Sequence, residues 1–198
     1  MNKILIFSII LATLLICSCT GKAMFKEIKT NTDQLQNLTI MGYGTGSSKS
    51  PNLAKAKAKT YAFANLAEQI SGKNFSYQKN NGSITFKTNT QATISGSEEV
   101  ASVYIGDHTY FTILSTKFSR ENSSTNDSWL LDTEYKTQDL EKSFIEKYQQ
   151  AVQQVIDKRF SNINRLEGRL FLTNIDVQYD ESSKQFSVKM QVLIVVEG

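Results

Sequence analysis

The chain has 198 residues, of which 40% are hydrophobic and 21% charged, and its formal net charge is only +3 at pH 7. This length is enough for one domain with a buried core. Positive and negative charges are nearly balanced, and the chain lacks the basic stripe that is typical of nucleic-acid binding. We therefore expect no nucleic-acid partner. Both cysteines lie at residues 17–19 and the chain has one histidine, so no Cys/His cluster has metal-ligand spacing, and we expect no metal and no cofactor.

The first 18 residues have the anatomy of an export signal. Lys3 gives a short positive start, and residues 4–16 are uncharged and mostly apolar. This stretch is too short for a stable membrane span, which takes about 20 apolar residues. We therefore expect residues 1–18 to be a signal peptide that is removed.

The end of the signal resembles the bacterial lipobox, in which an aliphatic residue stands three places before the lipidated cysteine and a small residue directly before it. Ile16 and Ser18 fill those places for Cys19, whereas Cys17 has the bulky Ile16 directly before it. The alternative is an ordinary secretory signal with two buried cysteines. The resemblance implies palmitate-type acylation of Cys19 and a lipid-anchored place in the bacterial cell envelope, with the outer membrane as the expected location. Two or three acyl chains, as bacterial lipoproteins carry, suffice for a lasting anchor.

The next residues, 19–36, are mostly polar and are expected to form a lipidated tether, which leaves residues 37–198 as a single domain. A strand pattern over residues 38–44 runs into a glycine-containing segment that we interpret as a flexible loop. Ser50 and Pro51 then predict the start of a helix, because serine caps exposed N–H groups and proline suits the first turn. Gly72 is placed to end this helix, near residue 70.

One stripe of the predicted helix is built largely of alanine. Small side chains let a helix axis lie close to whatever it covers, so we expect this stripe to pack on a sheet. A helix–helix assembly face is the alternative. The stripe consists of Ala54, Ala58, Ala62, Leu66 and Ile70.

Apolar and polar residues alternate over residues 74–135, as in strands that have one face exposed to solvent. Gly106 and Asp107 fit a two-residue hairpin turn, and a polar loop is expected at residues 120–128. The expected strands include residues 84–86, 92–94, 103–105, 110–118 and 129–135.

A second helix is predicted over residues 140–160, capped by Thr137. Its broad apolar face must cover a sheet or a partner, and we expect it to cover its own sheet. A hairpin over residues 175–196 completes the chain. The order β-α-β-β-β-α-β-β predicts an α+β fold, an antiparallel sheet with two helices on one face.

Catalytic chemistry finds little support in these residues. His108, beside the predicted turn, is expected to be an exposed turn residue, and no Gly-x-Ser-x-Gly elbow is present. The sharper candidate is a ligand loop at Gly42, Gly44, Gly46 and Ser47, because a glycine-rich loop before a helix can offer backbone N–H groups to an anion. A tight backbone crossing is the interpretation we prefer for these glycines.

Three segments together resemble a known group of proteins: residues 41–47, the alanine-rich residues 53–58, and residues 62–70 with their Asn-Leu-Ala and final Ile. They resemble small bacterial surface lipoproteins similar to the lipoprotein of the flagellar outer-membrane ring and to the N-terminal domain of flagellar assembly protein T. The resemblance covers residues 38–106 and 175–197. It implies an envelope-attached, non-enzymatic module that assembles into rings or complexes, and it supplies no site residues.

We therefore expect a lipid-anchored envelope protein with a non-catalytic structural or assembly role. Its expected partners are the membrane, through the lipid anchor, and further copies of itself or other envelope proteins. The alternative is a module that binds a ligand or an envelope polymer at residues 42–48. An enzyme is the third and least supported reading.

Overall fold

The computed structural model of the chain describes residues 25–29, 37–80, 82–87, 96–119 and 127–197. Two helices and antiparallel strands confirm the α+β class. Within these residues, neither helix has the length and apolar character needed to cross a membrane. In chain order the elements are β1 (Lys26–Ile28), β2 (Asn37–Ser47), α3 (Pro51–Ser71), β3 (Lys73–Gln78), β4 (Ser83–Lys87), β5 (Glu98–Tyr104), β6 (Thr109–Ser119), β7 (Ser128–Thr137), α4 (Leu140–Arg159), β8 (Arg165–Asp180) and β9 (Gln185–Glu197).

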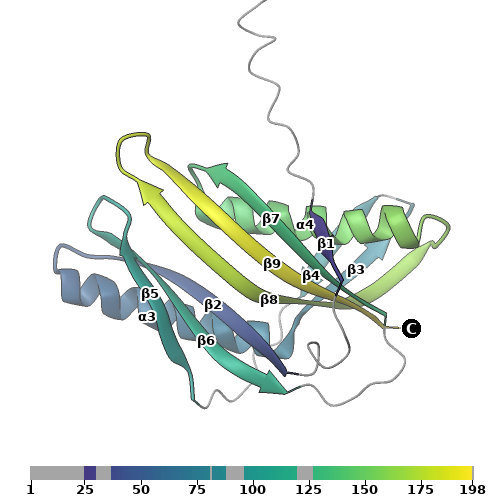
Figure 1. Ribbon diagram of the computed structural model, residues 1–198, viewed down its shortest axis with the longest axis horizontal. Coiled ribbons are helices and arrows are strands. Elements are labelled where there is room, and N and C mark those ends of the chain that lie inside the picture. The colour runs from purple at the N-terminus through teal and green to yellow at the C-terminus, as the bar shows by residue number, and fades with distance from the viewer. Residues whose placement is uncertain (1–24, 30–36, 81, 88–95, 120–126, 198) are drawn as a thin grey trace, which may run out of the picture.

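The strands form two sheets where the sequence predicted one. Six strands make a sheet in the order β1-β7-β9-β8-β3-β4, and three make another in the order β2-β6-β5 (Figure 1). The predicted order also had too few strands. It placed three strands between the helices, where the described residues form five, and it lacked β1, which precedes β2. Alternation of polar and apolar residues reveals each strand, but it does not show that β3 pairs with β8 as well as with β4, or that β1 pairs with β7, which lies far away in sequence. The predicted strand at residues 92–94 lies outside the described residues.

Each helix covers a different sheet, so the two helices do not share one face of a single sheet. Helix α3 packs on β2 and β6 of the three-stranded sheet, whereas α4 contacts β9, β7 and β4 of the six-stranded sheet. Three residues of the alanine stripe, Ala54, Ala58 and Ala62, are fully buried, as is Leu66. The core interpretation of this stripe is therefore confirmed.

Glycines in β2 allow α3 to lie unusually close to the sheet. Gly42, Gly44 and Gly46 alternate along the strand, and all three face the helix. A Cβ atom added at any of them would lie under 3.0 Å from backbone atoms of α3, closer than real Cβ atoms approach. The alanines and the glycines are thus two halves of one close contact between helix and strand.

The helix ends lie where they were predicted, but the hydrogen bonds that cap them differ from those expected. Pro51 begins α3, yet the Ser50 side chain makes no capping bond, and the Ala54 N–H donates to the Ser50 carbonyl at 3.0 Å. Gly72 ends α3 with a φ of 75°, which favours glycine. In α4 the cap is Asp139 rather than Thr137, because Asp139 Oδ1 accepts the Lys142 N–H at 3.0 Å.

The apolar face of α4 lies in the core, as expected. Phe144 is fully buried, and its ring centroid lies 4.2 Å from that of Tyr43 on β2. This contact ties α4 to the three-stranded sheet as well as to its own. The other buried apolar residues of α4 are Leu140, Tyr148, Ala151, Val152, Val155 and Ile156.

A buried glutamine joins the end of α3 to both β8 and α4. Gln69 is fully buried; its Oε1 accepts the Leu172 N–H of β8 at 3.1 Å, and its Nε2 donates to the Tyr148 hydroxyl at 3.5 Å. Burial raises the pKa of the Tyr148 phenol well above its usual value. The joint between the two sheets is therefore a neutral hydrogen-bonded link at physiological pH, and it limits relative motion of the sheets.

Candidate functional site

The structure gives the glycines of the expected ligand loop a different role. Residues 42–47 are not a loop but the second half of β2, and Gly44 pairs with Thr112 of β6. Their backbone N–H groups lie in a paired strand of a sheet that α3 covers on the side of these glycines, so they are not gathered around an anion. The segment is a strand and not the predicted loop, and its close approach to α3 agrees with the interpretation of these glycines as a tight backbone crossing. The Ser47 hydroxyl lies 2.6 Å from that of Thr109 in the same sheet.

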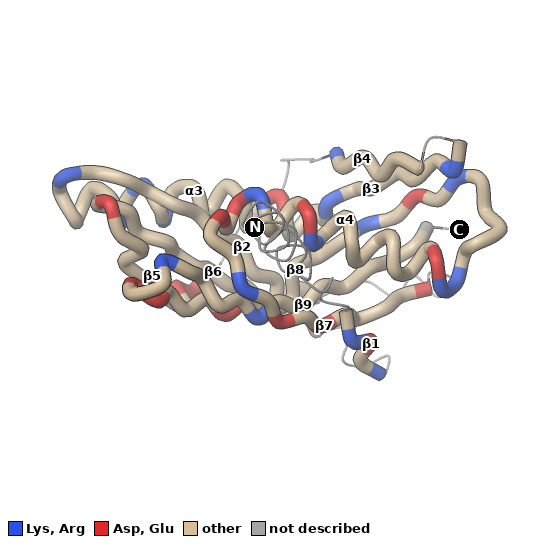
Figure 2. Tube along the Cα trace, turned by 90° about the horizontal axis from the view of Figure 1, so that it is seen from above, with Lys and Arg blue, Asp and Glu red and all other residues tan. Residues whose placement is uncertain are grey.

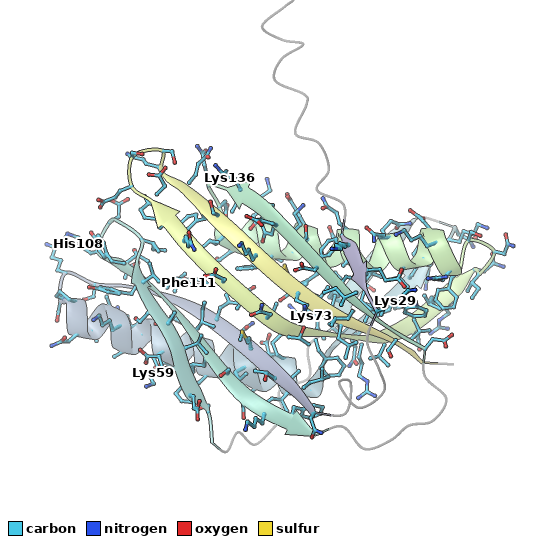
Figure 3. The ribbon with its side chains drawn as sticks, viewed as in Figure 1. Lys29, Lys59, Lys73, His108, Phe111 and Lys136 are labelled. Carbon is cyan, nitrogen blue, oxygen red and sulfur yellow. The ribbon has the colours of Figure 1, made fainter. Side chains whose placement is uncertain are left out.

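The other residues singled out from the sequence do not form a catalytic or metal-binding arrangement within the described residues. Cys17 and Cys19 lie outside the described residues. His108 is exposed at the tip of the β5–β6 hairpin with a φ of 58°, as a turn residue, and Figure 3 shows it at the far end of this hairpin. In the part of the chain that the structure describes, no three His, Cys, Asp or Glu side chains are placed to hold a metal ion.

The feature that stands out instead is an apolar surface on α3 and β5. Of the six large apolar side chains exposed in the described residues, five lie on these two elements. Exposed large apolar side chains that gather on neighbouring elements mark interaction sites more often than isolated residues do. The α3–β5 surface consists of Leu53, Tyr61, Phe63, Val100 and Tyr104, with exposed fractions between 36% and 60%.

The helix presents this surface because apolar residues occupy its outer face as well as its buried one. At about 100° per residue, Tyr61 and Phe63 lie about 80° to either side of the line through Leu53. Ala64 and Thr60 are exposed about 20° to either side of that line, and Lys57 is exposed about 40° from it. The outer face of α3 therefore carries small and polar side chains beside Leu53, with an aromatic ring on each flank.

Contacts between the elements join the strand part of the surface to the helix part. Lys59 Nζ of α3 lies 3.2 Å from Glu99 Oε2 of β5, and Figure 3 shows Lys59 projecting from α3. Tyr104 packs edge-on against Tyr110 of β6 at 5.4 Å, and Lys55 Nζ lies 5.0 Å from the centroid of the Tyr110 ring. These contacts hold the helix and the edge strand in one fixed relation.

Charge on the surface is divided between its two elements. The first half of α3 carries Lys55, Lys57 and Lys59, whereas β5 begins with Glu98 and Glu99. Elsewhere the two signs are interspersed along the chain (Figure 2). The ion pair of Lys59 with Glu99 joins these two groups of charges within one copy.

Sequence reasoning missed this surface although its signal was present. Leu53, Tyr61 and Phe63 lie off the alanine stripe, so a helix buried on the stripe must expose them. The exposure of Val100 and Tyr104 could not be read in the same way, because it depends on β5 lying at the edge of the smaller sheet.

Comparison with known proteins adds no further information on the site: no protein-family model, no curated protein and no solved structure matches the chain.

Proposed function

We propose that this chain is a lipid-anchored, non-catalytic protein of the bacterial cell envelope, and that it assembles with a second copy through the α3–β5 surface. The observation that carries the assembly role is the concentration of exposed large apolar side chains on two adjacent elements. The anchor rests on Ile16 and Ser18 before Cys19. The flagellar association that the resemblance implies stays a prediction.

A second copy is the occupant that fits the surface best. In an isologous dimer the same patch meets itself, so α3 and β5 of one copy contact the same surface of the other. The apolar residues between them then leave water together. Anchoring both copies in one membrane raises their local concentration, which favours association through a small surface.

Assembly is tested with the double variant Leu53→Ser and Tyr61→Ser. We expect the full-length chain to be dimeric in detergent and the double variant to be monomeric, with a melting temperature close to that of the unaltered chain, because both side chains are half-exposed in the subunit. Light scattering after size exclusion gives the mass.

The matched control for assembly is Ile145→Ser, since Ile145 is equally exposed but lies on α4. This variant should stay dimeric. A chain that is monomeric without any substitution, or a dimer that survives the double substitution, would contradict the assembly role and leave the anchor untouched.

The anchor is tested by replacing each cysteine in turn. Cys19→Ala should abolish fatty-acid incorporation and leave the precursor uncleaved, whereas Cys17→Ala should do neither, because a small residue stands directly before Cys19 alone. Metabolic labelling with a fatty-acid analogue measures incorporation. Labelling that persists in Cys19→Ala and disappears in Cys17→Ala would move the anchor to Cys17.

A further inference from the structure

The residue that precedes β1 is attached to α4 by one side-chain amide. Phe25 is 3% exposed and belongs to the main core cluster. Its backbone N–H donates to Gln154 Oε1 at 3.0 Å, and Gln154 Nε2 donates to the Phe25 carbonyl at 2.8 Å. A single glutamine of α4 therefore satisfies both backbone polar groups of Phe25, which fixes the position of this residue on the helix.

Two further contacts hold β1 at the edge of the six-stranded sheet. Its three residues pair with residues 130–132 of β7, and Figure 1 shows β1 beside β7 and α4. The Glu27 carboxylate also forms an ion pair with the Arg159 guanidinium, at 3.0 Å. This pair is partly exposed and contributes little stability by itself, so the main attachment is the burial of Phe25 with its two hydrogen bonds.

This attachment leaves little chain between the proposed lipid anchor and the folded domain. Cys19 and Phe25 are six residues apart in the sequence. Because an extended chain spans at most about 3.6 Å per residue, a lipidated Cys19 holds Phe25 within about 22 Å of the lipid. A compact body of about 160 residues has a radius of gyration of about 15 Å, which corresponds to a diameter of about 40 Å. The available reach is therefore about half the width of the domain.

A reach of this length restricts how the domain can lie on a membrane. With the opposite side of the domain on the lipid, Phe25 would stand about 40 Å above the surface, which the chain cannot span. The opposite edge of the six-stranded sheet is β4, five strand spacings or about 24 Å from β1. Helix α3 covers the other sheet, and Figures 1 and 2 both show it away from β1. While Phe25 stays docked, β1 must therefore lie in the half of the domain nearer to the membrane.

Charge near the attachment is too low to set the orientation by attraction to anionic lipids. Glu27 and Arg159 pair with each other, which leaves three lysines and one aspartate among these side chains. Segments that bind anionic lipids through charge have clusters of about four to eight basic residues. The exposed charged residues of the β1 segment and of the last turn of α4 are Lys26, Glu27, Lys29, Asp157, Lys158 and Arg159.

We propose that Phe25 and β1 act as a clamp that turns the side of the domain carrying β1 and the end of α4 toward the lipid surface. The proposal rests on the lipid anchor at Cys19 and does not depend on assembly. The α3–β5 surface belongs to the other sheet, so a clamp of this kind leaves it accessible to a second copy.

Energy transfer from tryptophan to dansyl-labelled lipid tests the orientation, with the lipidated protein reconstituted in vesicles of neutral phosphatidylcholine. Trp129, the only tryptophan of the chain, precedes Leu130 of β7, which pairs with Ile28 of β1. Tyr61→Trp in a Trp129→Phe background moves the donor to the exposed face of α3. We expect the transfer efficiency to fall when the donor moves from residue 129 to residue 61, because residue 129 is held on the side of the membrane.

Releasing the clamp provides a second measurement. Phe25→Ser combined with Gln154→Ala removes the buried ring and both hydrogen bonds. Cys19 is then joined to Asn37 of β2 by a chain that can span about 60 Å, so the domain is free to turn. Transfer from Trp129 should decrease, while circular dichroism should still report a folded domain.

The matched control for the clamp is Gln153→Ala, because Gln153 donates to Asp157 of its own helix. Transfer from Trp129 should not change in this variant. Equal transfer from residues 129 and 61, transfer from Trp129 that the double variant leaves intact, or transfer that appears only with anionic lipid would overturn the clamp.

Flotation of the vesicles reports the anchor separately from the orientation. A chain that does not float with the vesicles would refute lipidation at Cys19 and the clamp with it. A chain that floats, but fails the transfer measurements, would refute the clamp alone and leave the anchor supported.

Discussion

Replacing Gly44 with valine is expected to lower the free energy of unfolding by more than about 3 kcal/mol, or to prevent folding altogether. Overpacking a core costs typically about 1–3 kcal/mol when side chains can move aside. At Gly44 they cannot, because the nearest atoms are backbone atoms of α3, at Ala58, Tyr61 and Ala62. The helix would have to lift from the sheet as a unit. Urea denaturation followed by circular dichroism measures the loss.

A matched control for this change lies on the same strand. Thr39 is exposed on β2, so Thr39→Val introduces the same side chain without a clash. It should change the free energy of unfolding by less than about 0.5 kcal/mol, as surface substitutions usually do. If Gly44→Val were as stable as Thr39→Val, the close contact between helix and strand would be refuted.

Truncating Phe144 to alanine is expected to cost about 3–5 kcal/mol of the free energy of unfolding, the usual range for a fully buried phenylalanine. The side chain is 0% exposed and contacts Tyr43, so its loss leaves a cavity between α4 and the three-stranded sheet. The substitution should lower the melting temperature and leave the molecular mass of the folded protein unchanged. Thermal unfolding and molecular mass on the same sample measure both effects.

The neighbouring residue offers the comparison. Ile145 is 53% exposed on the same turn of α4, so Ile145→Ala should have little effect on stability. The opposite pattern, with a folded monomer in Phe144→Ala, would mean that the face of α4 serves as an interface and not as core.

Buried contacts hold the two sheets of the protein in a fixed relation. The α3–β5 surface lies on the three-stranded sheet and its helix. Gln69 and Tyr43 connect the sheets through buried contacts, so a partner on one sheet meets a second sheet that is held in a fixed position.

Local patterns in the sequence determined the helices well. Helix α3 begins at Pro51 and ends before Gly72, and α4 covers residues 140–159 with its apolar face inward. These features depend on side chains three and four residues apart, which the sequence places next to each other. The alanine stripe also predicted that α3 would lie close to a sheet, and it does.

The candidate sites depended on tertiary structure to a greater degree. From sequence, glycines at 42, 44 and 46 fit both a loop that binds anions and a strand under a helix, because a glycine pattern is the same in both. The pairing of β3 with β8 could not be foreseen at all, since it places Asn74 beside Arg169, which lies far away in the sequence.

The sequence by itself therefore determined the α+β class, the two helices and the side of each that is buried, because these follow from periodicity within one element. Tertiary structure alone decided that the strands divide into two sheets, that the glycines lie beneath α3, and which side chains form common surfaces. The physical reason is that strand pairing joins backbone groups far apart in the chain, and no local pattern specifies which edge meets which.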